Sequence, residues 1–192
     1  MKGLYVFLGI LLAVILIGGC GYNGMNGLRV NVDEKWAGVQ SSYQRRADLI
    51  PNLVATVKGV ANFEQATLTG VIQARANATS IKVDAKDLTP EKMQQFQQSQ
   101  GQLSQALGRL MVVSERYPEL KANQNFSDLQ KQLEGTENRI KVSRDDFNAA
   151  VKDYNIKVTS FPQNILAGMF GFKQRTMFEA EQGAQSAPKV QF

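Results

Sequence analysis

The sequence predicts an all-α protein: a long antiparallel, up-down helical bundle of three long helices and a short C-terminal helix, with an N-terminal membrane segment. Three observations support this fold class. Apolar residues recur at alternating steps of three and four through most of the chain, which is the period of an amphipathic helix. Runs of alternating polar and apolar residues, typical of strands, are missing. The stretch 3–19 carries no charged residue.

Residues 1–20 are interpreted as a membrane anchor or a lipoprotein signal peptide. After Lys2, the uncharged stretch 3–19 is close to the minimum length that spans the hydrocarbon core of a bilayer. Representative apolar positions of this membrane segment are Leu4, Ile10 and Ile17. The stretch ends in a lipobox-like Ile-Gly-Gly-Cys, which makes Cys20 a candidate for lipidation. Both alternatives keep the basic N-terminus cytoplasmic, or cleave it, and place the following domain outside the cytoplasm.

Residues 21–30 alternate glycines with asparagines and other residues, which predicts a flexible tether. The bundle is expected over 31–180. Its first helix is expected over 32–79, with Asn31 and Glu34 as a capping box at its start. Because Pro51 removes one backbone hydrogen bond and clashes with the preceding turn, a kink or break is expected at that residue.

The second helix is expected from Thr89-Pro90 to Pro118, because a hydroxyl N-cap followed by proline begins a helix. Seven glutamines lie between Gln94 and Gln105 on its outer face. The third helix is expected from about Ser127 to the residues before Phe161-Pro162. Long helices joined by short loops pack antiparallel.

The tail 161–178 is rich in phenylalanine and methionine and predicts a short fourth helix that caps the bundle. Counting helix directions places this tail at the membrane-distal end, near the loop at 80–88. Residues 181–192 are expected to be a disordered tail. Because monomers rarely expose large apolar patches, the tail is a candidate contact surface for self-assembly or for other envelope proteins. Its candidate interaction residues are Met169, Phe170 and Phe172.

Arg45 and Arg46 are further candidate interaction residues, next to Asp48 and the Pro51 kink. In the structural interpretation, Asp48 accepts the amides freed at Pro51 while one arginine pairs with an acid on a neighbouring helix. In the functional interpretation, the arginine pair binds an anionic ligand or a lipid headgroup.

Composition excludes several classes of site. Histidine is absent and Cys20 is the sole cysteine, so an imidazole-based catalytic triad, a structural zinc cluster and an internal disulfide are ruled out. The 22 basic and 17 acidic residues are interspersed, which argues against a nucleic-acid partner. We therefore expect no catalytic residues, no metal and no cofactor.

Several motifs together resemble the LemA family, over about residues 28–178. They are RRADLIPNLVATVKGV (45–60), SERYPELKAN (114–123), Asn125-Phe126, LEGTENRI (133–140), Phe147-Asn148, Tyr154-Asn155 and Phe161-Pro162. The resemblance implies a bacterial, membrane-attached, extracytoplasmic helical bundle, with no established enzymatic activity or cofactor and no catalytic residues to assign.

The leading functional hypothesis is a non-enzymatic scaffold or adaptor of the bacterial cell envelope, periplasmic or at the cell surface. Its partners would be the lipid bilayer, other envelope proteins or a second copy. The alternative is a ligand-binding or sensory bundle with a small molecule between the helices near Pro51, which a polar cavity there would favour. An enzyme is a third possibility, for which scattered carboxylates are the available acid–base groups.

Overall fold

The computed structural model describes residues 2–60 and 63–179. The described residues form helices joined by turns and irregular segments, with no strand among them, which confirms the all-α fold class. The helices are α1 Lys2–Lys58, α2 Gln65–Ser80, the 3₁₀ turn η1 Ala85–Asp87, α3 Pro90–Ser114, α4 Pro118–Lys121, α5 Gln124–Thr159 and α6 Gln163–Phe170.

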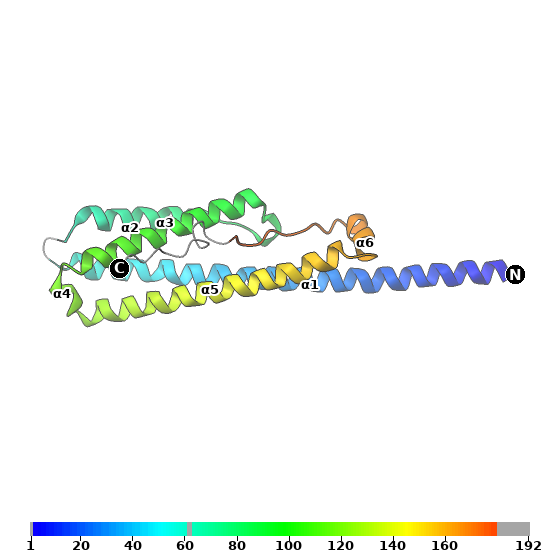
Figure 1. Cartoon of the computed structure of the whole chain (residues 1–192), viewed down its shortest axis with the longest axis horizontal. Helices are drawn as coiled ribbons and strands as arrows, with labels where there is room; N and C mark the ends of the chain where they lie inside the picture. Colours follow the sequence, from blue (N-terminus) through cyan, green and yellow to red (C-terminus); the bar gives the residue numbers. More distant parts are fainter. Residues whose placement is uncertain (1, 61–62, 180–192) are drawn as a thin grey trace, which may run out of the picture.

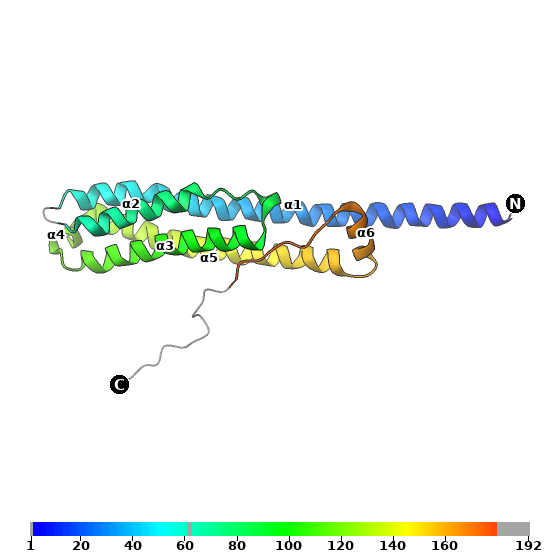
Figure 2. The same cartoon turned by 90° about the horizontal axis from the view of Figure 1, so that it is seen from above.

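The bundle consists of two antiparallel helix pairs (Figures 1 and 2). The helices α1 and α5 pack along each other as one pair, and α2 and α3 form the shorter second pair beside them. The N-terminal part of α1 projects well beyond the bundle. The short helix α6 packs on α1 and α5 at the place where α1 leaves the bundle.

The first helix does not break at Pro51, so the predicted break is wrong in position. Pro51 lies inside α1, and the chain leaves the helix after Lys58, at Gly59 and Val60. A proline has no N–H to donate to the carbonyl four residues earlier, which is that of Ala47. The Nε atom of Arg75, on α2, donates to this carbonyl at 2.8 Å. The helix therefore continues through its proline.

The segment 21–30 is helical, not the flexible tether that its glycines predict. Met25 is fully buried in the core. At Gly21, an added Cβ would lie 2.8 Å from Leu166 of α6, so this glycine lets the two helices approach closely. Packing against α5 and α6 thus outweighs the low helix propensity of glycine. The predicted capping box at residues 31–34 lies inside α1 and caps nothing.

The predicted start of α3 is confirmed: Thr89 Oγ1 accepts a hydrogen bond from the backbone N–H of Lys92 at 3.3 Å. This helix ends at Ser114, and Pro118 begins the short α4 instead of stopping α3. The helix α5 begins at Gln124, earlier than predicted, because Asn123 supplies its N-cap by accepting from the N–H of Phe126.

The predicted position of the tail is half right. The tail lies near the loop at 80–88, as predicted, since Arg175 donates a hydrogen bond to the carbonyl of Ala85. The predicted end of the bundle is wrong, because α6 lies beside the N-terminal part of α1 (Figure 1). The rings of Tyr22 on α1 and Phe170 on α6 are in edge contact, with centroids 5.1 Å apart. The break between α1 and α2 adds a chain reversal that the predicted continuous helix omits. Every later helix therefore runs opposite to the expected direction.

The core has two parts. An aromatic part lies around Trp36, whose ring packs on Phe96 and Phe147, and an aliphatic part lies between the α2–α3 pair and the far ends of α1 and α5. The indole N–H of Trp36 donates to the carbonyl of Val83 at 3.0 Å and so fixes the loop after α2. Trp36 and Tyr43 are core residues, as their place on the apolar stripe predicts.

Within the described part of the chain, no helix holds an apolar stretch long enough to cross a membrane. Leu4 is exposed, with 62% of its surface accessible. The side chains of Ile10 and Ile17 lie outside the described residues, and so does the segment 181–192.

Candidate functional site

A polar groove of about 730 Å³ lies between α3 and α5 and is the candidate functional site. Its floor is formed by Tyr43 and Arg46 of α1, and α5 contributes Glu137 and Arg144 to one wall. The opposite wall is the glutamine-rich face of α3. Its lining residues there are Gln94, Gln97, Gln98, Gln100, Gly101, Gln102, Ser104 and Gln105.

The guanidinium of Arg46 is the centre of this groove and is almost fully buried, with 1% of the side chain exposed. Its Nη1 atom contacts Glu137 Oε1 at 2.5 Å and Ser104 Oγ at 2.8 Å. Its Nη2 atom donates to Gln100 Oε1 at 2.6 Å, and the group lies 5.1 Å from the centre of the Tyr43 ring. The Nε atom is buried without a hydrogen-bond partner. One side chain of α1 is thereby bonded to both α3 and α5.

Gln100 extends this network to the fourth helix, because its Nε2 atom donates to the carbonyl of Ala78 on α2 at 3.2 Å. The Arg46 network therefore joins α1, α2, α3 and α5 at one level of the bundle. Paired and hydrogen-bonded charges of this kind specify how helices register against one another.

The two arginines of the sequence motif have different roles. Arg46 forms the predicted ion pair with an acid on a neighbouring helix, whereas Arg45 is exposed. Asp48 accepts a hydrogen bond from Gln44 Nε2 at 2.8 Å and is exposed, so it does not serve the backbone at Pro51. With Arg46 paired to Glu137, the groove offers mainly amide groups, together with the side chains of Glu179 and Arg144. These groups suit a polar partner.

The chain after α6 runs back along the bundle and is held by two asparagines of α5. Asn155 accepts from the backbone N–H of Arg175 at 2.8 Å and donates to its carbonyl at 2.9 Å. Asn148 does the same for Phe178, at 2.8 and 3.2 Å. Seven residues of helix and three residues of extended chain both span about 10 Å, so the spacings match. We call residues 171–179, held in this way, the clasped tail.

The clasped tail completes the aromatic core. The ring of Phe178 lies against Trp36 and Phe147, with centroids 5.9 and 5.5 Å away. The hydroxyl of Tyr154 donates to the carbonyl of Lys173 at 2.9 Å, and burial raises the pKa of this tyrosine above its usual value of 10.0, although the nearby Arg175 opposes the shift. The tail is therefore a structural part of the bundle.

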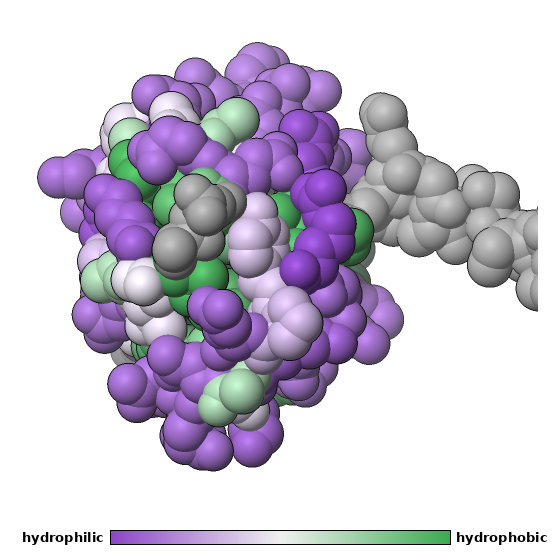
Figure 3. All heavy atoms as spheres, turned by 90° about the vertical axis from the view of Figure 1, so that its left-hand side faces the viewer, coloured by the Kyte–Doolittle hydropathy of each residue, from purple (hydrophilic) through white to green (hydrophobic). Residues whose placement is uncertain are grey.

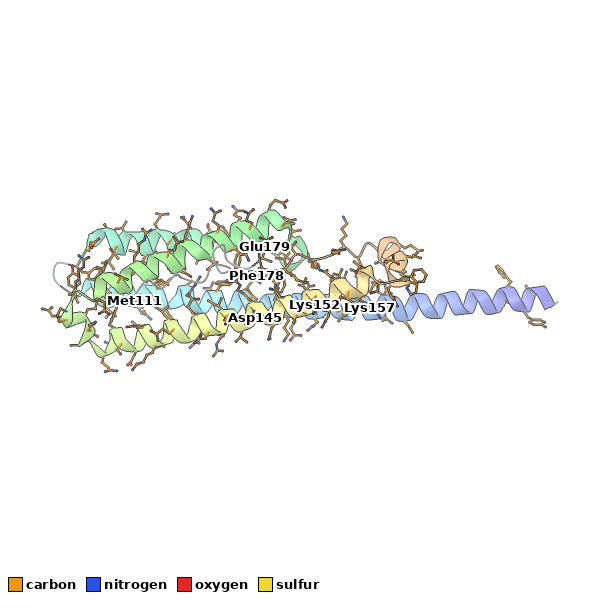
Figure 4. The ribbon with its side chains drawn as sticks, viewed as in Figure 1. Met111, Asp145, Lys152, Lys157, Phe178 and Glu179 are labelled. Atoms are coloured by element: carbon orange, nitrogen blue, oxygen red, sulfur yellow. The ribbon has the colours of Figure 1, made fainter. Side chains whose placement is uncertain are left out.

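The last described residue of the tail, Glu179, lies at the rim of the groove (Figure 4). Its backbone carbonyl accepts hydrogen bonds from Arg144 Nη2 at 3.3 Å and from Gln97 Nε2 at 3.5 Å. The tail thus bridges α3 and α5 and bounds one side of the groove.

The other candidate interaction residues separate into two groups. Met169 and Phe170 are exposed, with 74% and 50% of their surfaces accessible. Phe172 is 8% exposed and belongs to the core, where Arg29 lies over its ring at 5.3 Å, so its prediction as a contact residue is wrong. Cys20 is exposed.

Sequence reasoning missed the roles of Asn148 and Asn155. The available signal is the repeat of an aromatic residue followed by asparagine, Phe147-Asn148 and Tyr154-Asn155, at a spacing of one heptad. Among the described residues, no three acidic, cysteine or histidine side chains gather closely enough to hold a metal ion.

A family model and one relative both carry the name LemA. The model of the LemA family matches residues 35–192. Protein LemA of Metamycoplasma hominis is 24% identical over 144 residues, which cover 75% of this chain and 62% of that protein. Magnetosome protein MamQ 2 of Paramagnetospirillum magneticum is 39% identical over 90 residues, and magnetosome protein MamQ of Magnetospirillum gryphiswaldense is 34% identical over the same length.

The 90-residue matches cover 47% of this chain but 33% of each MamQ protein, so the chain spans about a third of the length of these relatives. The family model, by contrast, covers the bundle from Lys35 onward, including the Arg46 network and the clasped tail. The chain belongs to the LemA family.

Proposed function

We propose that this protein is a membrane-attached, non-enzymatic scaffold of the bacterial cell envelope, with its bundle outside the cytoplasm. The observation that carries the proposal is the continuity of α1. One helix, Lys2–Lys58, contains both the uncharged stretch 3–19 and the first helix of the bundle. A rigid helix of this kind would hold the bundle, and any protein bound to it, at a fixed distance from the bilayer.

The polar groove is the surface that we assign to a partner. It is long, open and lined by amides, which pair with the backbone and polar side chains of another protein. The groove contains two carboxylate side chains, those of Glu137 and Glu179. It has no histidine to act as a general acid or base beside them, since the sequence contains none. A binding role therefore suits the groove better than acid–base catalysis.

Fractionation of cells expressing the full chain tests the attachment. We expect the protein to float with membranes and to stay there after washing at high salt or alkaline pH. Replacing Leu11 and Val14 with arginine should release it, because charges at the centre of an apolar span are costly. The matched control replaces the exposed Ile72 and Val112 of the bundle with arginine and should leave the protein in the membrane fraction.

Site-specific photocrosslinking tests the scaffold role. A photoreactive residue at Gln98, on the exposed wall of the groove, should give discrete adducts with envelope proteins. The same probe at Ile72, an exposed position on α2, is the control and should give none. Equal adduct patterns from both positions would contradict the assignment of the groove to a partner.

A ligand-binding bundle is the second candidate, and one observation favours it. The groove lies beside Arg46, about one helical turn before Pro51, which is where the sequence predicts a ligand cavity. Native mass spectrometry of the membrane-extracted protein would detect a small molecule that remains bound. A Gln98→Leu variant should lose that molecule if it occupies the groove.

A further inference from the structure

The end of the bundle that carries α6 combines exposed apolar side chains with an excess of basic residues. This end lies where the projecting part of α1 leaves the bundle (Figure 1). Neither the polar groove nor the clasped tail accounts for this surface.

The exposed apolar side chains lie in α6 and in the turn before it. Ile165 and Met169 are four residues apart and share one side of α6, and Phe161 lies in the turn that leads into this helix. The exposed fractions of Phe161, Ile165 and Met169 are 80%, 56% and 74%. The opposite side of α6 packs on the bundle through Leu166 and the buried Ala167. We call the exposed residues Phe161, Ile165, Met169 and Phe170 the α6 stripe.

The α6 stripe lies next to the end of the uncharged stretch 3–19. Gly21 and Tyr22 of α1 lie against α6. At 1.5 Å per residue, Tyr22 is about 5 Å beyond Gly19 along the helix axis. The polar headgroup layer on each side of a bilayer is about 5–7 Å thick. If the stretch 3–19 occupies the hydrocarbon core, α6 falls at the level of the headgroups.

The charges at this end are mainly basic. The segments 20–32 and 154–178 contain no aspartate or glutamate, and their basic residues are Arg29, Lys157, Lys173 and Arg175. Arg175 is paired with Asp33 of α1 at 3.7 Å, so Lys157 and Lys173 are the two basic residues that we consider further. Figure 4 shows Lys157 near the α6 end of α5. Basic residues flanking an apolar surface are typical of helices that bind anionic bilayers.

The opposite end of the bundle differs. Figure 3 shows it as predominantly hydrophilic, with smaller apolar areas. Its charges are mixed: Arg116 pairs with Glu64 at 3.0 Å, and Lys121 pairs with Glu115. The combination of an apolar stripe and an excess of basic charge is therefore a property of one end of the molecule.

We propose that the α6 stripe inserts into the headgroup layer of the bilayer that holds α1, with Lys157 and Lys173 on anionic lipid headgroups. The inference rests on the proposed membrane attachment and adds a second contact to it. The bilayer contact would fix the tilt of the bundle relative to the membrane. Two separate contacts, through α1 and through the α6 stripe, define an orientation that α1 alone does not. This geometry applies to an uncleaved anchor, in which the stretch 3–19 remains joined to the bundle.

Lipid quenching in reconstituted vesicles tests the proposal on the full chain. A Cys20→Ser background receives a fluorescent label at Met169→Cys, Tyr5→Cys or Val112→Cys, in vesicles of phosphatidylcholine and phosphatidylglycerol that contain brominated lipid. Tyr5 reports the membrane segment, and Val112 is an exposed residue of α3. We expect quenching at positions 5 and 169 and none at position 112.

The outcomes separate the two proposals. Quenching at position 5 without quenching at 169 overturns the bilayer contact and leaves the attachment. No quenching at either position removes the attachment as well. Label fluorescence at 169 that depends on protein concentration and not on brominated lipid shows contact with a second copy and overturns the bilayer contact.

Charge variants test the lipid chemistry. Replacing Lys157 and Lys173 with glutamine should reduce quenching at position 169 by about half or more in the anionic vesicles, since each basic residue near such a surface contributes to binding. In vesicles of phosphatidylcholine alone the same variant should show no change. The matched control replaces Lys58 and Lys121, exposed at the opposite end, and should show none in either vesicle. Equal effects of both pairs would contradict the proposal.

Discussion

The Nε atom of Arg75 donates a hydrogen bond to the carbonyl of Ala47 at 2.8 Å and so replaces the backbone bond that Pro51 cannot make. A proline inside a helix usually leaves this carbonyl to water or bends the helix. Here a side chain from the neighbouring helix α2 serves it. The long helix α1 can therefore run from the N-terminal segment to the far end of the bundle.

Replacing Arg75 with leucine should lower the free energy of unfolding by about 1 kcal/mol, the usual contribution of one hydrogen bond. In a Pro51→Ala background the new backbone N–H of residue 51 can donate to the carbonyl of Ala47. Arg75→Leu should then lower the free energy of unfolding by less than about 0.5 kcal/mol. Urea unfolding of the four proteins in this double-mutant cycle measures the difference. An Arg75→Leu cost that is equal in both backgrounds would show that the two residues act independently.

Glu137→Gln should lower the free energy of unfolding by about 1.5–3 kcal/mol, the range for hydrogen bonds to charged groups, because it leaves the buried Arg46 without a counter-charge. Glu134→Gln, one turn away, is the matched control. Glu134 is exposed and accepts from Gln130, so its replacement should change the free energy by less than about 0.5 kcal/mol. Similar unfolding curves for both variants would argue against a structural role for the Arg46 network.

The asparagine clasp makes a prediction for amide hydrogen exchange. The N–H of Arg175 donates to Asn155, so Asn155→Ala should speed the exchange of this amide by roughly tenfold or more, while Asn125→Ala should leave it unchanged. Asn125 is exposed near the start of α5 and serves as the control. Unchanged exchange at Arg175 in the Asn155→Ala variant would mean that the core, not the asparagine, holds the tail.

Tyr154 makes the bundle sensitive to alkaline pH. Burial raises its pKa in the folded protein, so the unfolded chain loses the phenolic proton first. The stabilisation is complete below the unfolded pKa of about 10 and falls as the pH rises above it. Tyr154→Phe should show a smaller loss of stability between about pH 9 and pH 11. Denaturant midpoints of both proteins, measured across this pH range, test the prediction. An equal loss of stability in the wild-type protein and in Tyr154→Phe would contradict it.

Much of the fold follows from residues read in order. The Thr89-Pro90 start of α3, the apolar stripe through Trp36 and Tyr43, and the ion pair of a motif arginine with an acid on another helix all follow from spacing and residue type. The helix start and the apolar stripe depend on local chemistry, which the sequence displays directly. The sequence predicts the ion pair as a kind of contact, but it does not identify the partner Glu137, 91 positions away.

The features that sequence reasoning missed depend on contacts between distant residues. Pro51 stays helical because Arg75 serves Ala47, and the glycines at 21–30 stay helical because α6 and α5 pack on them. Because the break is expected at Pro51 within one continuous helix, the chain reversal after Lys58 is missed. The predicted position of α6 is therefore at the wrong end of the bundle. The groove is formed by three helices, so the glutamines of α3 alone do not reveal it.

The distance between residues 19 and 41 of α1 tests the central claim, that one uninterrupted helix joins the N-terminal segment to the bundle. Spin labels at Gly19→Cys and Ser41→Cys, both exposed, in a Cys20→Ser full-length protein report this distance by pulsed electron paramagnetic resonance. A continuous helix predicts a single narrow distribution centred at about 33 Å. A broad distribution at shorter distances would show a flexible tether and contradict the account.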